Sequence, residues 1–310
     1  MRHVNIFVAG ATGTLGRPAV RALVAAGHRV RGLARDAQRA ELIRDLGADA
    51  VVGDLFDAEA IRAAVDGSDA VLHLATRIPP LVRMWRRSAW RDNDRVRSQG
   101  ASVLVGAALA AGVRTYVQES ISFLYAAQGD RWIDETAPID AVWPLASAHD
   151  AERETARFAT HGGAGVILRF ASFYAPYAPS TLDTIRLARR RLFGVVGRGD
   201  HYVSAIHVDD AAAAVVAALA VPGGIYNVCD DEPLTMREYV LALTRACGFP
   251  APLRVPTPLA RMLLGPVAAV LTRSQRVANG MFKATAGWAP RCRSVREGWS
   301  EIARQLGRGR

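Results

Sequence analysis

The feature that most constrains this chain is the heptapeptide GATGTLG at residues 10–16, because of what surrounds it. It directly follows the apolar run HVNIFVA at residues 3–9, which predicts a buried strand, and residues 14–26 then have helical spacing. A glycine triad between a strand and a helix is the context that a dinucleotide-binding loop requires. We therefore predict that a nucleotide cofactor binds here, against the alternative of a plain tight turn.

The glycines of this loop have separate roles in such a unit. The first permits a tight turn, the second lets the backbone approach a pyrophosphate, and the third lets the helix pack on the strand. The helix N-terminus then directs amide N–H groups at the phosphates. The loop residues expected to bind the cofactor are Gly10, Thr12, Gly13, Thr14, Leu15 and Gly16.

Strand and helix patterns alternate over residues 1–170. Strands are expected at 3–9, 29–34, 48–52, 69–74, 113–119 and 164–170, and helices at 14–26, 38–46, 57–65, 98–111 and 147–160. This alternation predicts an α/β protein with a Rossmann-type, doubly wound parallel sheet and ligands at the carboxyl ends of its strands. Prolines then break the pattern. We expect a dinucleotide-binding domain over 1–170 and a smaller C-terminal substrate-binding lobe over 171–310, with segments returning to the sheet.

Several motifs resemble the short-chain dehydrogenase/reductase superfamily, particularly its extended, epimerase/dehydratase-like branch. The glycine spacing G-x-x-G-x-x-G is typical of it. GDLFD (53–57) is similar to the branch's Asp-Leu signature, HLAT (73–76) to the loop lining the cofactor's ribose, and LRFASFYAP (168–176) to the segment beside the nicotinamide. The resemblance implies that Asp54 bonds the adenine amine. The other residues that it implies around the cofactor are Leu55, Leu74, Ala75 and Thr76.

The end of the second expected strand, LARD, bears on which nicotinamide cofactor is bound. NAD binders place Asp or Glu near this point to bond the ribose hydroxyls, whereas a 2′-phosphate calls for an arginine. Ala34 stands where the acid is expected and Arg35 follows, and a guanidinium fits a phosphate with paired hydrogen bonds. This favours NADP over NAD. Against it, Asp36 could serve a ribose hydroxyl, and Arg35 could be a solvated arginine.

The superfamily's usual catalytic pair, Tyr-x-x-x-Lys on the helix after the fifth strand, is missing. That helix begins LASAHDAERETARF and contains no tyrosine, and the one lysine of the chain, Lys283, lies far beyond it. In the pair, the tyrosine exchanges a proton and the lysine lowers its pKa, so the absence counts against ordinary alcohol–ketone redox. His149 and Arg153, four apart on one helix face, are a candidate substitute, because imidazole can exchange a proton near neutral pH. The alternative is that both face solvent.

The exit of the fifth strand, ESISFLY, supplies the other catalytic candidates. The family carries here a Ser or Thr that bonds the reacting oxygen. Ser120 and Ser122 bracket that position, where Ile121 stands. Tyr125 matches the tyrosine of the family's V-Y-G sequence, and Tyr174 matches that of Y-G-P. For both tyrosines the alternative is a packing role.

Composition counts against several other classes of function. The net charge is +10, but nearly all basic residues are arginines, which indicates a composition bias; only residues 77–97 concentrate the charge. No cysteine pair or His/Cys/carboxylate cluster has metal-ligand spacing. The longest apolar stretch, 262–271, is too short to span a bilayer. We expect a cytoplasmic protein without metal, nucleic-acid or membrane partners.

The sequence thus predicts an NAD(P)-dependent oxidoreductase or epimerase/dehydratase-like enzyme for a small organic substrate, such as a sugar nucleotide, a ketone or a polyketide-like molecule. The alternatives are a non-redox isomerase or cyclase on the same fold, and an NADP(H)-binding sensor or regulatory protein without turnover. The resemblance also implies a homodimer through helices 98–111 and 147–160. The alternative is that the face of helix 98–111 packs on the sheet.

Overall fold

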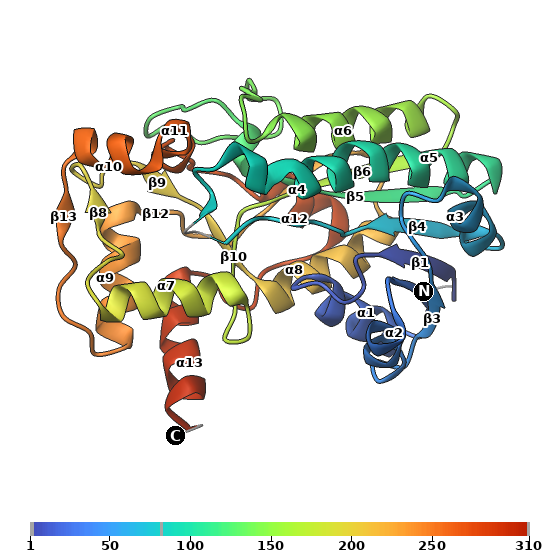
Figure 1. Cartoon of the computed structure of the whole chain (residues 1–310), viewed down its shortest axis with the longest axis horizontal. Coiled ribbons are helices and arrows are strands. Elements are labelled where there is room, and N and C mark those ends of the chain that lie inside the picture. The colour runs from blue at the N-terminus through green and yellow to red at the C-terminus, as the bar shows by residue number, and fades with distance from the viewer. Residues whose placement is uncertain (1–2, 81–82, 309–310) are drawn as a thin grey trace.

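A seven-stranded parallel sheet runs through the protein, whose computed structural model describes residues 3–80 and 83–308 (Figure 1). The strand order is β11-β6-β5-β4-β1-β2-β3, and every pairing in it is parallel. The strands are β1 (Asn5–Ala9), β2 (Arg29–Ala34), β3 (Asp49–Val52), β4 (Ala70–His73), β5 (Thr115–Ile121), β6 (Ala164–Phe170) and β11 (Gly224–Val228). The predicted doubly wound parallel sheet is confirmed, and its seventh strand, β11, returns from the C-terminal part of the chain.

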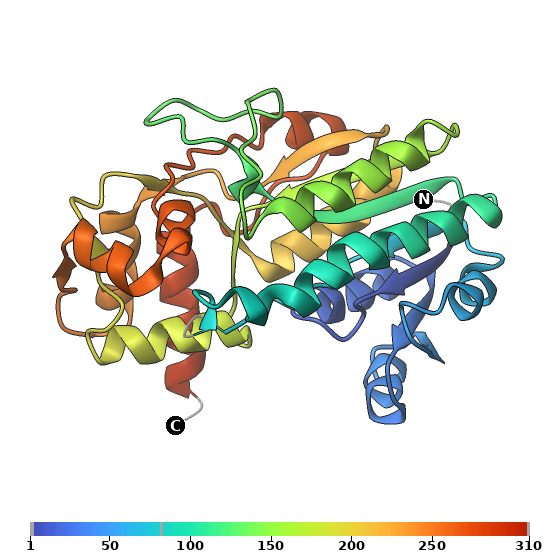
Figure 2. The ribbon, with the colours of Figure 1, turned by 45° about the horizontal axis from the view of Figure 1, so that its top comes forward.

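Helices cover both faces of this sheet. On one face lie α1 (Gly16–Ala25), α2 (Ala37–Arg44), α8 (Val208–Ala217) and α12 (Gly280–Ala286). On the other face lie α3 (Ala58–Val65), α5 (Ala101–Ala110) and α6 (Ala146–Ala159). Figure 2 shows α5 and α6 side by side over the central strands.

The sequence of β1 explains why both faces need cover. Ile6 and Val8 belong to the apolar cluster beneath α1 and α2, whereas Phe7 and Ala9 belong to the cluster beneath α3 and α5. Successive side chains of a strand point to opposite faces, so a continuous apolar run is buried only between two helical layers. The loops that follow the strands meet at the carboxyl ends of the strands, which we call the carboxyl edge of the sheet.

The helix expected over 98–111 begins earlier than its apolar pattern indicated. α4 (Arg91–Arg95) continues through a π-helical turn (Val96–Gly100) into α5. The segment RDNDRVRSQG has no apolar periodicity because its inward side is polar, with Asn93 and Arg97 buried. Arg97 pairs there with a carboxylate of β5, a partner that helical periodicity cannot indicate.

The remainder of the chain forms a second cluster of short elements at the carboxyl edge of the sheet. Three two-stranded sheets join β7 (Ser172–Tyr174) to β10 (Ala205–His207), β9 (Tyr202–Val203) to β12 (Leu234–Thr235), and β8 (Val195–Val196) to β13 (Arg254–Val255). The helices are α7 (Pro179–Arg189), α9 (Met236–Ala246), α10 (Thr257–Leu264), α11 (Pro266–Leu271) and α13 (Val295–Arg308). Within residues 3–80 and 83–308, no helix combines the length and apolarity needed to cross a membrane.

Candidate active site

The loop after β1 is held so tightly that two of its glycines cannot be replaced without a clash. Gly10 has a φ of +90°, and a Cβ there would lie 2.5 Å from the backbone nitrogen of Ala75. A Cβ on Gly16 would overlap the carbonyl of Gly10, and the Gly13 amide donates to that same carbonyl at 2.9 Å. The loop therefore presents bare backbone, as a cradle for a pyrophosphate requires.

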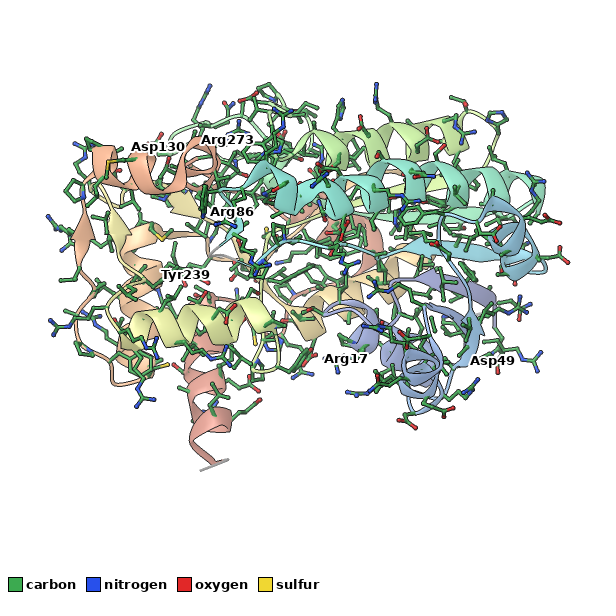
Figure 3. All side chains as sticks on the ribbon, viewed as in Figure 1. Arg17, Asp49, Arg86, Asp130, Tyr239 and Arg273 are labelled. Atoms are coloured by element: carbon green, nitrogen blue, oxygen red, sulfur yellow. The ribbon has the colours of Figure 1, made fainter. Side chains whose placement is uncertain are left out.

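The N-terminus of α1 is available to an anion. Leu15 precedes the helix and supplies no capping side chain, and the first turn contains no acidic residue. Arg17 is exposed in that turn (Figure 3). The first amides of a helix lack intrahelical partners and carry partial positive charge, so this end fits the phosphates of a nicotinamide dinucleotide. Thr12 and Thr14 flank it, both half-buried.

At the end of β2, Asp36 and Arg35 have different surroundings. The Asp36 carboxylate accepts the Arg39 amide at 2.9 Å, caps α2 and pairs with the Arg39 side chain. These bonds, the Arg39 amide first, lower the pKa of Asp36. Arg35 is exposed and makes no hydrogen bond or ion pair with any residue that the structure describes. The Asp36 carboxylate thus already binds Arg39, whereas the Arg35 guanidinium remains available to a ligand.

The other expected cofactor residues lie at the same edge, because β3 and β4 flank β1 and β2 in the sheet. Asp54 is exposed just beyond β3, and its carboxylate accepts the Phe56 amide at 3.1 Å. Leu55 is buried, against Gly100. Beyond β4, Leu74 is buried, Ala75 lies against Gly10, and Thr76 is exposed.

A buried ion pair accounts for Ser120, one of the catalytic candidates. The Ser120 hydroxyl donates to Glu152 at 2.6 Å, and Arg169 donates to the two oxygens of the same carboxylate at 2.8 and 2.7 Å. All three side chains are buried. Ser120 therefore ties β5 to α6 and has its proton committed. Glu152 lies within the sequence HDAER. Because it is a charged residue, the apolar periodicity of the sequence could not indicate that it is buried.

The two tyrosine candidates are both packed away from solvent. Tyr125 donates to the side-chain oxygen of Asn227 at 2.8 Å, and the Arg169 guanidinium lies 4.7 Å from its ring centre. Burial raises the pKa of Tyr125 to about 12. Tyr174 packs against His207 and Trp299, and burial raises its pKa as well. Both tyrosines would need a change of surroundings to exchange a proton with a substrate.

His149 and Arg153 share α6 but do not form a pair. Arg153 is 68% exposed and donates to Asp150 at 2.6 Å. His149 is 38% exposed, and its Nδ1 lies 3.8 Å from an oxygen of Glu152. The structure thus turns Arg153 to solvent and leaves His149 beside an already paired carboxylate.

An apolar cluster occupies the junction between the end of β5 and the start of α6. Leu124, Leu145, Ala148 and Val270 are buried there, with Ile121 packed against them. None of these side chains titrates. Ser122 lies next to Ile121, is buried, and makes no side-chain hydrogen bond with any described residue.

Two further polar pairs lie under the carboxyl edge. Arg97 donates to both oxygens of Glu119 at 3.0 and 2.8 Å. The Nδ1 atom of His73 lies 3.0 Å from the side-chain oxygen of Gln118, and burial lowers the pKa of His73 to about 4. A neutral His73 at the end of β4 acts as a fixed spacer, not as a proton donor near neutral pH.

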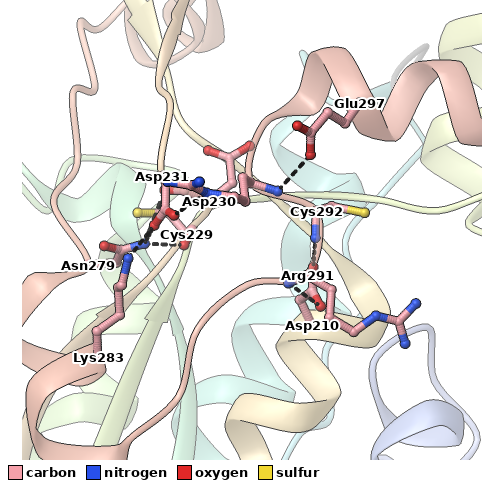
Figure 4. Close-up of polar contacts among 10 residues, drawn as sticks. Asp210, Cys229, Asp230, Asp231, Asn279, Lys283, Arg291, Cys292 and Glu297 are labelled. Atoms are coloured by element: carbon pink, nitrogen blue, oxygen red, sulfur yellow. Dashed lines mark hydrogen bonds and ion pairs between the residues drawn. The ribbon is translucent and has the colours of Figure 1, made fainter.

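Acidic residues join the C-terminal segments around β11 (Figure 4). Asp210 accepts the amides of Arg291 and Cys292 at 3.0 and 2.9 Å, and Asp231 accepts from Lys283 at 2.8 Å. Asp230 is buried, and neither of its oxygens has a hydrogen-bond partner among the described residues. Within the same described part, no group of three His, Cys, Asp or Glu side chains could hold a metal ion.

Residues 6–229 match the model of the NAD dependent epimerase/dehydratase family. The chain belongs to this family. Over 307 residues it is 37% identical to a 3-diazoavenalumate denitrifying reductase of Streptomyces, a match that covers 95% of this chain and 99% of the relative. Over 300 residues it is 32% identical to the 2-alkyl-3-oxoalkanoate reductase of Shewanella oneidensis, covering 89% and 73%. The chain is accordingly an enzyme of the NAD(P)-dependent oxidoreductase and epimerase type.

Solved structures of other proteins share the fold. A UDP-glucose 4-epimerase of Thermotoga maritima, solved with UDP-glucose, is 19% identical, with a TM-score of 0.80 over 98% of this chain and 99% of that one. A human epimerase family protein solved with NADPH is 20% identical, with a TM-score of 0.79 over 97% and 100%. The family to which the chain belongs is NAD dependent, and the glycine cradle after β1 fits such a cofactor.

Proposed function

We propose that this enzyme is an NADPH-dependent reductase whose hydride acceptor needs no proton from the protein, namely an aryl diazonium ion. The observation that carries the proposal is the apolar cluster at the start of α6, the helix on which the resemblance would place the family's catalytic pair. Ile121, Leu145 and Ala148 surround the junction of β5 and α6, and none of them can donate a proton.

The chemistry of the acceptor decides whether such a site is competent. Hydride addition to a ketone leaves an oxyanion, which a general acid must protonate. NADPH, when bound, would supply a hydride for the diazonium carbon, from which N2 would leave with the electrons of the broken C–N bond, so that no proton would be consumed. An apolar wall excludes water from a reactive cation and needs no titratable group. The partly exposed members of the cluster, Ile121 and Phe123, are suited to that role.

The relatives support this reading of the acceptor. The name of the Streptomyces relative is that of a denitrifying reductase of a diazo compound. That relative matches this chain over almost its whole length. That name describes a reduction in which nitrogen is lost. We carry that reaction class to this chain because it would explain the absence of a tyrosine and a lysine from α6.

Arg35 supports NADPH as the reductant. It forms no hydrogen bond or ion pair with a residue of the described ranges, and the neighbouring acid that could hold a ribose hydroxyl, Asp36, already caps α2. A free guanidinium at this place fits a 2′-phosphate.

The test is turnover of diazotised 3-aminocinnamate with NADPH, corrected for the enzyme-free rate. We expect cinnamate to form in a one-to-one ratio with NADPH consumed, and we expect 3-acetylcinnamate, a ketone of similar shape, to react far more slowly. Equal or faster reduction of the ketone would contradict the proposal.

Ketone reduction is a second candidate, favoured by the Ser122 hydroxyl, which has no hydrogen-bond partner among the described residues, and by the Shewanella relative. Ser122→Ala separates the two. It should abolish turnover of the ketone if Ser122 donates the proton, and it should leave diazonium reduction nearly unchanged. The non-redox and sensor alternatives predict no NADPH consumption with either substrate.

A further inference from the structure

The segment from residue 83 to residue 90, together with Trp143, forms a fixed aromatic platform. Trp90 is buried, and its indole N–H donates to the carbonyl of Met84 at 2.8 Å, which closes the segment on itself. The Trp90 and Trp143 rings meet edge to face, with centroids 6.4 Å apart. Such packing holds the segment in one conformation.

Two arginines lie on this platform without an acidic partner. The Arg86 guanidinium is 4.8 Å from the ring centre of Trp85, and that of Arg87 is 6.0 Å from the ring centre of Trp143. Neither forms an ion pair with a described residue. Among the neighbouring arginines, Arg77 pairs with Asp92 and Arg97 pairs with Glu119. Arg91 and Arg95 have no ion pair with a described residue either, but each donates a hydrogen bond, to the Ser88 carbonyl and to Gln99.

The platform adjoins the apolar cluster of the candidate site. Trp143 lies two residues before Leu145, which belongs to that cluster, and Ser147 of α6 donates to Asp94 of α4 at 2.8 Å. α4 and the start of α6 are therefore fixed to each other. Figure 3 shows Arg86 near the middle of the molecule, on the segment that leads from β4 to α4.

We propose that Arg86 and Arg87 bind the carboxylate of an aromatic acid substrate whose ring lies against the apolar cluster. A guanidinium binds a carboxylate through two parallel hydrogen bonds, and one held on an aromatic face loses little freedom when it does so. The proposal deepens the proposed function and rests on it for the identity of the reacting group. The carboxylate of the substrate is inferred from Arg86 and Arg87 alone, independently of the reacting group.

The test measures binding of cinnamate and of the uncharged cinnamamide to the whole protein by calorimetry, with NADP⁺ present. We expect cinnamate to bind more tightly than cinnamamide. Arg86→Ala/Arg87→Ala should weaken cinnamate binding by about ten-fold or more, the range of a lost charge-assisted pair, and should leave cinnamamide and NADPH binding unchanged. Arg87→Lys should show a smaller loss, since it keeps the charge and not the paired geometry.

Arg44→Ala is the matched control, because Arg44 is an exposed arginine of α2 paired with Glu41. Equal binding of cinnamate and cinnamamide, no detectable cinnamate binding, or an unchanged affinity in the double variant would overturn the proposal. Cinnamate binding that depends on both arginines, with no diazonium reduction, would contradict the proposed function and leave this site standing. Diazonium reduction with an unchanged KM in the double variant would support the proposed function and contradict this site.

Discussion

Arg169 bonds both oxygens of Glu152, with its Nε 2.8 Å from Oε1 and its Nη2 2.7 Å from Oε2. The pair joins β6 to α6, and the Ser120 hydroxyl attaches β5 to the same carboxylate. It thereby fixes the start of α6, with Leu145 and Ala148, against the end of β5. The apolar cluster of the candidate site owes its shape to this buried polar contact.

Breaking this pair from one side should be costly. Glu152→Gln or Arg169→Met leaves a charge or a set of donors buried without its partner, and we expect each to lower the free energy of unfolding by about 3–5 kcal/mol. The double variant Glu152→Leu/Arg169→Met should lose less than the sum of the two. Denaturant unfolding measures both. Arg157→Ala, which breaks the more exposed pair with Glu154, should cost less than about 1 kcal/mol. A similar small loss at Glu152 would refute the argument.

Gly10 and Gly13 should respond differently to a methyl group. Gly10→Ala places a Cβ in contact with the backbone of Ala75 at a positive φ, so we expect a loss of about 2 kcal/mol or more of stability, or an insoluble protein. A Cβ on Gly13 meets only the Gly10 carbonyl, at 3.2 Å. Gly13→Ala should therefore fold, and bind NADPH more weakly. Thermal unfolding and NADPH titration distinguish these outcomes.

The control for the glycine series is Gly106→Ala in α5, where a Cβ would meet nothing within 4 Å. Alanine is preferred over glycine within a helix by roughly 0.5–1 kcal/mol, so this variant should be as stable as the parent or more so. Weakened NADPH binding in Gly106→Ala would show that the assay does not report on the loop.

Arg35→Ala tests the choice of cofactor. We expect NADPH affinity to fall by about ten-fold or more, because charge-assisted bonds to the 2′-phosphate are lost, and NADH affinity to stay the same. Fluorescence titration with the two cofactors measures this, with Arg44→Ala as the control on the neighbouring helix. An equal loss for NADPH and NADH, or none for either, would place the 2′-phosphate elsewhere.

Asp230 should make stability fall as pH rises. Burial raises the pKa of Asp230, so the folded protein holds that proton more tightly than the unfolded chain does. Its contribution is complete below the unfolded pKa of about 4 and is lost as pH rises through the folded value. Asp230→Asn should therefore raise Tm more at about pH 8 than at about pH 5, by about 3 °C or more at the higher pH.

Asp231→Asn is expected to act in the opposite direction. Burial raises the pKa of Asp231, but hydrogen bonds from Lys283 and Asn279 outweigh burial and lower it. Its stabilising contribution is present above the unfolded pKa, so removing the charge should lower Tm at about pH 8. Equal and parallel effects of the two variants would contradict this assignment.

The parts of the fold that follow from local pattern could be predicted from the sequence. Strand–loop–helix at residues 3–26 and the later alternation indicated the sheet, because apolar runs and glycine turns act over a few residues. The π-helical start of the helix near Gly100 was missed, because Arg97 depends on Glu119, which lies on another element. The functional roles expected for Arg35, His149 and Tyr125 remain predictions.

The site was predicted less completely, for a physical reason. The apolar cluster joins Ile121, Leu145 and Val270, and contacts between residues so far apart in the chain leave no periodic signal. Glu152 looks like a solvent-facing residue of a polar helix start, and only the position of Arg169 shows that it is buried. The signal at Asp36 was available, since an aspartate before AQRAE is a helix cap.

The most direct test of the central claim is an isotope measurement on diazotised 3-aminocinnamate, with NADPH deuterated at each face of nicotinamide C4 in turn. The account predicts one deuterium at the ring carbon that lost nitrogen from one of the two labelled cofactors, and none when unlabelled NADPH is used in D2O. Deuterium entering that position from the solvent, or cinnamate formed without label from either cofactor, would contradict it.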